Sequence, residues 1–434
     1  MIRHIGIRRE DKNRWERRVP LVPSAVQKLV GELGLRVTMQ PSTLRIFPDA
    51  DYARAGAVIA EDLAACDLVM GVKEMPSPFF RKDGMYLFFS HTIKGQKHNM
   101  AMLRKLVGLG CSLLDYERIV DEKGRRLVFF GRYAGLAGMI DTFWALGRRL
   151  ESQGVKTPFT QVKMAHEYPD LPAVKKAFAA IGAELRKTGI PAALRPLTVG
   201  FAGYGNVSKG AQEVFDLLPH RVVTPAQLVA GIDGDVAHEL VKVVFREEHT
   251  VRPAAAGARF DLQEFFSSPA LYESAFRPYL DHLTVLVNCI FWSPAAPRLI
   301  TLEESRELWG QGRSPKLLVI GDISCDIEGG IQFTLKETMP DAPVYVYNPD
   351  RHEITFGVEG PGPVVMAVDN LPCELSAESS QEFSSALMPF IEQVPHLDPR
   401  AALDDCRIPE PLRRAVLLWH GRFPAEYAFM QKFL

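Results

Sequence analysis

The sequence lacks an excess of charge of either sign and lacks long apolar runs. Its 51 Lys and Arg residues against 52 Asp and Glu residues leave a formal net charge of −1, so no net field recruits nucleic acid or an anionic membrane. No apolar stretch reaches membrane-spanning length, and the first residues, MIRHIGIRREDKNRWERR, lack the apolar segment of a secretory signal. We therefore expect a cytoplasmic protein that binds a small molecule, with neither a nucleic-acid nor a membrane partner.

The cysteines form no CxxC pair and no cluster with histidine. The six stand at positions 66, 111, 289, 325, 373 and 406. This spacing argues against a disulfide framework and against a structural zinc site. We interpret them as thiols of the protein core and expect no metal.

Apolar residues are sufficient for two cores. Hydrophobic residues make up 47% and charged residues 24% of the 434-residue chain, a composition typical of globular proteins, and the length favours two domains. Alternating strand-like and helix-like segments predict the α/β class. We expect two Rossmann-like domains with doubly wound, mainly parallel sheets and an active-site cleft between them. Residues 1–134 with 350–434 would bind the substrate, and residues 135–349 the dinucleotide.

The individual elements follow from apolar periodicity and from glycine, proline and capping signals. Strands are expected at 2–7, 35–41, 68–73, 85–90, 111–117, 125–131, 197–202, 241–245, 283–292, 316–324 and 344–349. Helices are expected at 25–33, 96–110, 135–154, 175–187, 377–394 and 411–420. The last two should return to the first domain or to the hinge.

Two neighbouring predicted strands, 68–73 and 85–90, end in polar side chains. Lys73 and Glu74 end the first, and His91 follows the second. Carboxyl ends of neighbouring parallel strands open into one crevice, where an amine and an imidazole can form an acid/base pair. For either residue alone, a solvated strand end is the more common situation.

The segment GYGNVSKG, residues 203–210, follows an apolar strand and begins a predicted helix. Gly203 permits a tight turn, and Gly205 permits a pyrophosphate to approach the backbone. The helix N-terminus, with Asn206, Val207 and Ser208, would supply N–H donors. Ser208 occupies the usual third glycine position, and an ordinary strand-to-helix turn is the alternative.

The strand expected next, beginning at His220, has no carboxylate at its end. An acidic residue about twenty positions after the glycines usually binds the ribose 2′-hydroxyl of NAD. The sequence there is HRVVTPAQL. We therefore favour NADP(H), with NAD(H) as the alternative.

Nine segments together resemble one enzyme family. They are WERRVPLVP, GVKEMP, FFSHTIK, LLDYERIVDEKGRR, FGRYAGLAGM, GYGNVSKGAQ, NCIFW, GDISCDIEGG and AVDNLP, in this order. They resemble the lysine-ketoglutarate reductase half of the bifunctional aminoadipic semialdehyde synthase. The resemblance extends over essentially the whole chain. A more distant resemblance links the same segments to fungal lysine-forming saccharopine dehydrogenase and to alanine dehydrogenase.

The resemblance implies that the ε-amine of L-lysine condenses with 2-oxoglutarate and that NADPH reduces the imine to saccharopine. It also implies residue roles, with Lys73 and His91 as the acid/base pair beside Glu74 and Glu117. Further substrate contacts would come from Arg18, Lys94, Arg126, Phe130, Asp322 and Asp326, and further cofactor contacts from Asn288, Cys289 and Ile290.

The residue types suit this chemistry, although each has a plainer alternative. Arg18 and Arg126 can bind the carboxylates of a dianion bidentately, but one lies in a charged loop and the other flanks a turn. Asp322 and Asp326 could equally cap a loop or a helix. Cys289 is not needed as a nucleophile, because imine reduction has no covalent enzyme intermediate.

Two other functions stay open at this point. One is an alanine dehydrogenase-like or other opine-forming enzyme that uses a different amine. The other is a catalytically silent nucleotide-binding protein that regulates a partner. For the enzyme, a homo-oligomer or functional coupling to a separate saccharopine-oxidising enzyme is a further expectation.

Overall fold

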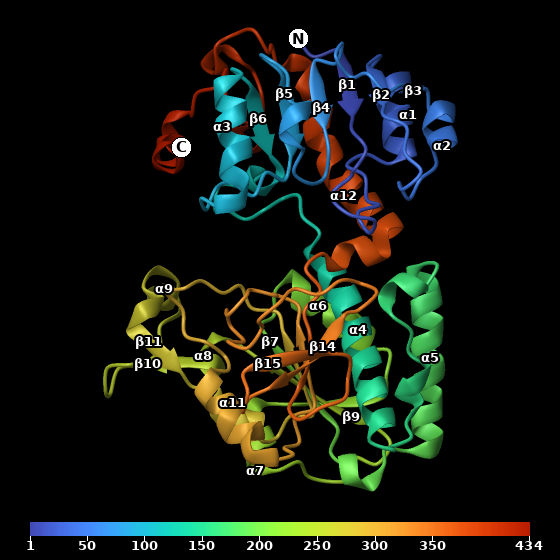
Figure 1. The fold of residues 1–434 in the computed structure, drawn as a ribbon, viewed down its shortest axis with the longest axis vertical. Coiled ribbons are helices and arrows are strands. Elements are labelled where there is room, and N and C mark those ends of the chain that lie inside the picture. Colours follow the sequence, from blue (N-terminus) through green and yellow to red (C-terminus); the bar gives the residue numbers. More distant parts are fainter. The chain divides into compact units, whose positions relative to one another are not determined.

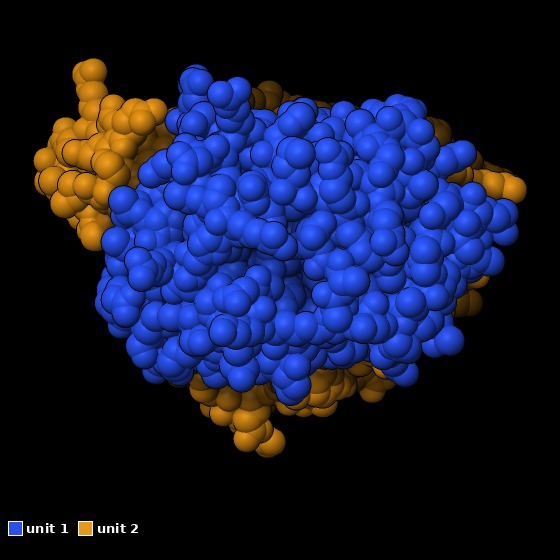
Figure 2. Space-filling model, turned by 90° about the horizontal axis from the view of Figure 1, so that it is seen from above, with its two compact units in different colours: residues 1–130, 376–434 blue, residues 131–375 orange.

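The protein consists of two compact α/β units. A computed structural model describes residues 1–434 and divides them into residues 1–130 with 376–434 and residues 131–375 (Figures 1 and 2). The sequence placed these boundaries at 134 and 350. Residues 350–375 lie in the second unit because they include β15 and β16, which pair with β14 of that unit.

The first unit has a seven-stranded sheet in the order β17-β6-β5-β4-β1-β2-β3. Its strands are β1 (His4–Ile7), β2 (Arg36–Met39), β3 (Val58–Ile59), β4 (Leu68–Met70), β5 (Met85–Phe88), β6 (Ser112–Asp115) and β17 (Val416–Leu418). All pairs are parallel except β17 with β6. The central strands β1, β4, β5 and β6 are buried along their whole length, as expected for a parallel sheet covered on both faces.

Five helices of the first unit surround this sheet. They are α1 (Pro23–Gly31), α2 (Asp49–Arg54), α3 (Met100–Gly108), α12 (Ser376–Ile391) and α13 (Glu410–Arg414). The Ser380 and Ser384 hydroxyls of α12 accept hydrogen bonds from the Val19 and Val22 N–H groups at 3.0 and 3.2 Å. Helix α12 therefore belongs to the first unit, although it lies late in the sequence.

Three predicted elements of the first unit are wrong. The sequence also predicts a helix, a strand, a second helix and a second strand within residues 49–73, and the second of these helices is instead a series of turns. Residues 125–131 form no strand, because only an isolated bridge joins Val120 to Arg126. The apolar side chains Val128 and Phe130 of this segment are buried in the core. Residues 411–420 are only partly helical, because the apolar run 416–418 instead covers the otherwise open edge of β6.

The second unit has an eight-stranded sheet in the order β15-β14-β16-β13-β12-β7-β9-β8. Its strands are β7 (Thr198–Ala202), β8 (His220–Val223), β9 (Leu240–Phe245), β12 (Val285–Asn288), β13 (Val319–Asp322), β14 (Val344–Asn348), β15 (Glu353–Phe356) and β16 (Val364–Met366). Strand β14 is antiparallel to both neighbours, and the other pairs are parallel. Two mainly parallel sheets confirm the predicted fold class.

Helices and a small hairpin complete the second unit. The helices are α4 (Gly131–Ser152), α5 (Leu171–Thr188), α6 (Asn206–Phe215), α7 (Pro225–Ala230), α8 (Glu247–Thr250), α9 (Leu262–Ser267), α10 (Arg277–Leu280) and α11 (Leu302–Trp309), and the hairpin is β10 (Val251–Pro253) with β11 (Tyr272–Ser274). No helix is both long and apolar enough to cross a bilayer.

Two glycines let helices α4 and α6 touch backbone to backbone. A Cβ atom on Gly135 would lie 1.9 Å from the Val207 carbonyl oxygen, and one on Gly210 would lie 2.0 Å from the Arg132 carbonyl oxygen. Any side chain at either position would therefore push the helices apart. This contact fixes the N-terminal end of α6, where the glycine turn ends.

Candidate active site

Lys73 and His91 follow the carboxyl ends of two adjacent strands. Strands β4 and β5 pair in parallel, with Val69 opposite Tyr86 and Met70 opposite Leu87. The register therefore brings the segments after both strands to the same edge of the sheet, as the sequence predicted. Lys73 is partly buried.

His91 is held by a carboxylate and an aromatic ring. Its Nδ1 lies 2.6 Å from Oε1 of Glu74, and its ring stacks on Phe89 with centroids 6.0 Å apart. The Asn99 side-chain amide donates to the His91 carbonyl at 3.2 Å and to Glu74 at 3.3 Å. An Nδ1–H bond to the carboxylate leaves Nε2 as the imidazole nitrogen that can exchange a proton.

Glu74 stays ionised in this environment. Burial raises its pKa, but the hydrogen bond and charge of His91, together with the Lys12 ammonium, lower that pKa well below its usual range. The Lys12 Nζ atom lies 3.2 Å from Glu74 Oε2. Glu74 therefore presents a fixed negative charge to the imidazole.

Glu10, which the sequence did not single out, holds the backbone before Glu74. Its carboxyl accepts hydrogen bonds from the N–H groups of Val72 and Lys73 at 2.6 and 3.0 Å. Burial, with the neighbouring charge of Glu16, raises the pKa of Glu10 to about 7. No local signal could identify it, because its partners are more than sixty positions away.

A buried aspartate supports the next strand end. Asp115 accepts hydrogen bonds from the Ser90 N–H at 3.1 Å, from the Ser90 hydroxyl and from the Glu117 N–H at 2.8 Å. Burial and the charge of Glu117 raise the pKa of Asp115 to about 6. Glu117 in turn pairs with Arg126, whose Nη2 lies 2.6 Å from its carboxylate. Arg126 is about half exposed, so it can reach a solute.

Arg18 is occupied within the protein. Its Nε and Nη2 donate to the two carboxylate oxygens of Glu16 at 2.8 and 2.6 Å, and its guanidinium lies 4.3 Å above the Phe130 ring. Phe130 stacks on Phe383 of α12 with centroids 4.3 Å apart. Arg18 and Phe130 therefore lie together, whereas Lys94 lies exposed in the loop after β5.

In the second unit, the glycine turn has the conformation that a dinucleotide site requires. Gly203 has φ +95°, and its position faces the Cys289 carbonyl and Ile290, since a Cβ there would lie 3.2 and 3.3 Å from them. Gly205 and Asn206 are exposed, and no atom lies within 4 Å of a Cβ built on Gly205. The space and the free N–H groups of α6 fit a phosphate.

The adjacent strand ends are tied together by Asp322. Its carboxylate accepts hydrogen bonds from Asn288 Nδ2 at 2.8 Å, from the Thr334 hydroxyl at 2.5 Å and from the Cys325 N–H at 3.2 Å. Burial raises the pKa of Asp322 to about 6. These contacts favour the structural alternative for Asp322. Asp326 follows in the same loop.

Cys289 is a protonated thiol rather than a nucleophile. Burial and the nearby Asp322 raise its pKa, against a hydrogen bond with Ser208 that lowers it. Ser208 is itself fully buried and accepts a 2.8 Å hydrogen bond from Gln212. The side chain at the third position of the glycine pattern therefore faces the interior, while its backbone N–H lies in the first turn of α6.

The strand order differs from the one that the sequence analysis assumed. Strand β9, not β8, lies next to β7, so the strand end that corresponds to the ribose-binding one of dinucleotide folds is that of β9, where Arg246 and Glu247 follow. The Arg246 guanidinium lies 5.0 Å from the centre of the Tyr204 ring within the glycine turn. Burial and a hydrogen bond with Glu247 raise the pKa of Tyr204. An acid and a base therefore flank this position.

Comparison with known proteins gives matches along the whole chain. Residues 6–137 match the family described as alanine dehydrogenase/PNT, N-terminal domain. The alpha-aminoadipic semialdehyde synthase of Bos taurus, named as mitochondrial, is 36% identical over 99% of this chain and 47% of that protein. The chain thus spans about half the length of the first curated relatives it matches.

A second relative and a solved structure extend the comparison. The saccharopine dehydrogenase of Emericella nidulans, named as NAD(+) and L-lysine-forming, is 27% identical over 87% of this chain and 89% of that protein. The structure of an L-alanine dehydrogenase aligns over 99% of this chain and 98% of that chain, with a TM-score of 0.63 and 18% identity; this likeness shows the fold.

These findings agree with the resemblance that the sequence motifs carried. The chain is a homologue of the lysine-ketoglutarate reductase part of alpha-aminoadipic semialdehyde synthase and is related to fungal saccharopine dehydrogenase and to alanine dehydrogenase, whose N-terminal domain family includes residues 6–137.

Proposed function

We propose that the protein is a lysine–2-oxoglutarate reductase that forms saccharopine. The observation that carries this proposal is the 36% identity to an alpha-aminoadipic semialdehyde synthase across 99% of the chain. The acid/base cluster at the ends of β4 and β5 supplies the groups that such chemistry needs. Cytoplasmic location stays a prediction.

His91 is the proposed proton carrier. Lysine Nε attacks the keto carbon of 2-oxoglutarate, and loss of water from the resulting carbinolamine gives the imine, so protons must leave nitrogen and reach the departing oxygen. With Nδ1 bound to Glu74 at 2.6 Å, Nε2 can accept and return these protons. The ionised Glu74 stabilises the imidazolium while it exists.

Lys73 is the proposed second member of the pair. A lysine ammonium has a pKa near ~10.4 when unperturbed, so its use as a base requires burial or positive neighbours. The Glu10 carboxyl, whose pKa burial raises to about 7, binds the Lys73 N–H. Glu10 therefore anchors the main chain at Lys73.

We assign the substrate carboxylates first to Arg126 and Lys94. Both are exposed, and Arg126 can exchange Glu117 for a substrate carboxylate in a bidentate contact. Arg18 would have to give up its buried pair with Glu16, so its proposed role is to hold Phe130 as an apolar wall. Asp326 remains the proposed acidic contact from the second unit.

A nicotinamide cofactor, when bound, supplies the hydride that reduces the imine carbon. Gly203, Gly205 and the first N–H groups of α6 would hold its pyrophosphate, and Cys289 with Ile290 would lie beside the turn. NADP(H) remains our proposal, now with Arg246 as the residue that binds the 2′-phosphate. Glu247 would serve NAD(H), the alternative that the fungal relative's name carries.

An assay of cofactor oxidation tests the proposal. The purified chain is incubated with NADPH or NADH, with 2-oxoglutarate or pyruvate as the keto acid, and with one amine at a time, namely lysine, ornithine, alanine or ammonia, and the product is identified by mass spectrometry. Saccharopine formed only with lysine is the expected result. Turnover with pyruvate and ammonia would support the alanine dehydrogenase alternative, and nucleotide binding without any turnover would support the silent regulatory protein.

A further inference from the structure

His91 has a backbone conformation that residues other than glycine rarely adopt. Its φ is +47°, in the left-handed region where the Cβ atom crowds the following carbonyl group. A residue keeps such a conformation only where the surrounding structure imposes it, and such residues are frequent at active sites. The contacts around His91 must therefore hold its main chain in this position.

The residues on both sides of His91 are fixed in the interior of the first unit. Ser90 and Thr92 are fully buried, and their hydroxyl oxygens lie 2.7 Å apart. The Asp115 carboxylate accepts the Ser90 N–H at 3.1 Å, and the Thr92 carbonyl accepts the Gly95 N–H at 2.8 Å. These contacts anchor the neighbours of His91, but the His91 carbonyl group has a different partner.

The partner of the His91 carbonyl group is the side chain of Asn99. Its Nδ2 donates to the His91 carbonyl oxygen at 3.2 Å and to Glu74 Oε1 at 3.3 Å. Glu74 Oε1 is also the atom that lies 2.6 Å from His91 Nδ1. A carbonyl and an ionised carboxylate only accept hydrogen bonds, so the amide nitrogen of Asn99, and not its oxygen, faces them. One amide therefore binds both the main chain of His91 and the carboxylate that orients the imidazole.

The helix that follows Asn99 does not use this amide. Asn99 directly precedes α3, at a position where an asparagine side chain commonly caps a helix. Here the side chain makes no capping hydrogen bond, and the backbone N–H of Asn99 is bonded to the Gln96 carbonyl at 2.9 Å. Only 6% of Asn99 is exposed. The buried amide thus serves the pair of Glu74 and His91 rather than the helix.

We propose that Asn99 is a positioning residue of the active site, which holds His91 in its left-handed conformation and fixes the Glu74 carboxylate against the imidazole. This role rests on the proposed function, in which His91 Nε2 carries protons to and from the reacting atoms. A displaced imidazole would no longer reach those atoms. Loss of the amide should therefore slow the catalytic step and leave substrate binding nearly unchanged.

The isosteric change Asn99→Asp tests this role. Aspartate caps a helix about as well as asparagine, so a residue that served only α3 would tolerate the change. A positioning residue would not, because a carboxylate cannot donate to the His91 carbonyl and it repels Glu74. With lysine, 2-oxoglutarate and NADPH, kcat should fall by about tenfold or more, and each KM should change by less than about threefold.

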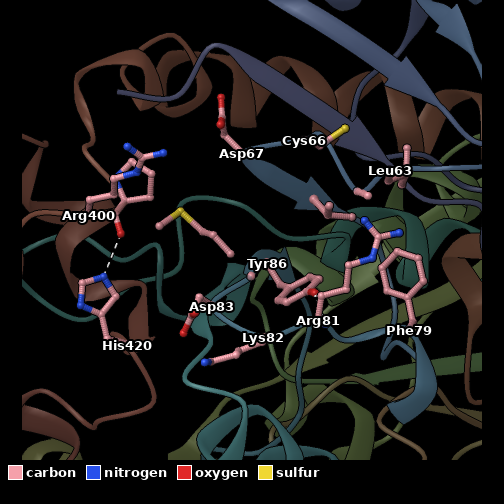
Figure 3. A pocket seen from close by; sticks show the side chains of 15 residues that line it. Leu63, Cys66, Asp67, Phe79, Arg81, Lys82, Asp83, Tyr86, Arg400 and His420 are labelled. Carbon is pink, nitrogen blue, oxygen red and sulfur yellow. Dashed lines mark hydrogen bonds between the residues drawn. The ribbon is translucent and has the colours of Figure 1, made fainter.

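A matched control and a second variant complete the kinetic test. Lys82→Gln lowers the net charge by the same amount at an exposed position before β5, the strand that His91 follows, and should leave kcat unchanged; Figure 3 shows this side chain at the pocket that it lines. Asn99→Ala removes the donor without adding charge, and it replaces Asn99→Asp if that variant does not fold. Its kcat should fall to a similar extent, and far-UV circular dichroism checks the folding of each variant.

A measurement without substrate tests the same contact. In the chain labelled with 15N-histidine, NMR follows the charging of the His91 ring with pH. The charged groups around Glu74 and His91, which include Lys12 and Asp115, are the same in every variant. Asn99→Asp adds a carboxylate beside Glu74, so the pH midpoint of the His91 signals should rise by about one pH unit, whereas the Lys82→Gln control should keep the midpoint of the unchanged protein.

The possible outcomes distinguish the role of Asn99 from the proposed function. An unchanged kcat in a folded Asn99 variant, or an unchanged pH midpoint in Asn99→Asp, would overturn the positioning role. If the unchanged chain formed no saccharopine, the proposed function would fail, and the NMR titration alone would decide whether Asn99 acts on His91.

Discussion

Replacing Glu374 by glutamine should flatten the loss of stability that the second unit undergoes as pH rises. Glu374 and Asp141 are both buried, and each carboxyl acts on the pKa of the other. Burial raises the pKa of Glu374 to about 8, and burial with the neighbouring carboxyl raises the pKa of Asp141 as well. The folded pair therefore holds protons that the unfolded chain has released.

The direction and the size of the change in the free energy of unfolding with pH follow from this difference in proton binding. A raised folded pKa stabilises the protein fully at low pH, and that stability is lost as pH rises from the unfolded value of 4.5 towards about 8. Each pH unit removes about 1.4 kcal/mol, so the loss between about pH 5 and about pH 8 is at most about 4 kcal/mol for Glu374. The glutamine side-chain oxygen can still accept the hydrogen bond that the His166 backbone N–H donates to Glu374 at 3.3 Å.

Urea unfolding at several pH values, followed by far-UV circular dichroism, measures this effect. In Glu374→Gln the free energy of unfolding should fall less between pH 5 and pH 8 than in the unchanged protein. Glu353→Gln, an exposed change on β15, is the control and should keep the original slope. If Glu374→Gln also kept that slope, the carboxyl pair would not be the source of the pH dependence.

Three further changes test other parts of the reasoning. Lys73→Met should preserve cofactor binding, measured by nicotinamide fluorescence, and remove most turnover; full turnover would exclude Lys73 from the mechanism. Arg246→Ala should raise KM for NADPH about tenfold and change KM for NADH little, whereas equal effects on both would remove Arg246 from the 2′ position. Gly135→Ala should lower the free energy of unfolding by about 2 kcal/mol or more, because the new Cβ would lie 1.9 Å from a carbonyl oxygen. Gly31→Ala is the control and should not lower it, because no atom lies within 4 Å of a Cβ at that position. Equal melting temperatures of the two variants would contradict the close packing of α4 against α6.

Local sequence patterns were sufficient to predict those features of the candidate site that depend on strand ends and turns. The apolar runs before Lys73 and His91 predicted two strands, and the parallel pairing of β4 and β5 places both residues at one edge. The positive φ of Gly203 likewise follows from the need for a tight turn before α6. These features require only neighbours in sequence and the general rule that parallel strand ends share an edge.

Features that depend on residues far apart in the sequence could not be predicted from local patterns. Strands β8 and β9 are both short, and only the tertiary order of the sheet shows that the strand beside β7 is β9, which Arg246 follows, and not β8. Glu10 binds backbone groups more than sixty positions away. Arg18 looked available in a charged loop, but its partner Glu16 is buried with it.

The antiparallel pairing of β17 with β6 has a consequence for synthesis of the protein on the ribosome. The second unit is one continuous segment, residues 131–375, whereas the first unit needs residues 376–434. Until these emerge, the edge of β6 and the N–H groups of Val19 and Val22 have no partner from the tail. Residues 1–130 therefore complete their folding only after residues 376–434 have emerged, and until then a nascent chain keeps an open sheet edge, a site for aggregation.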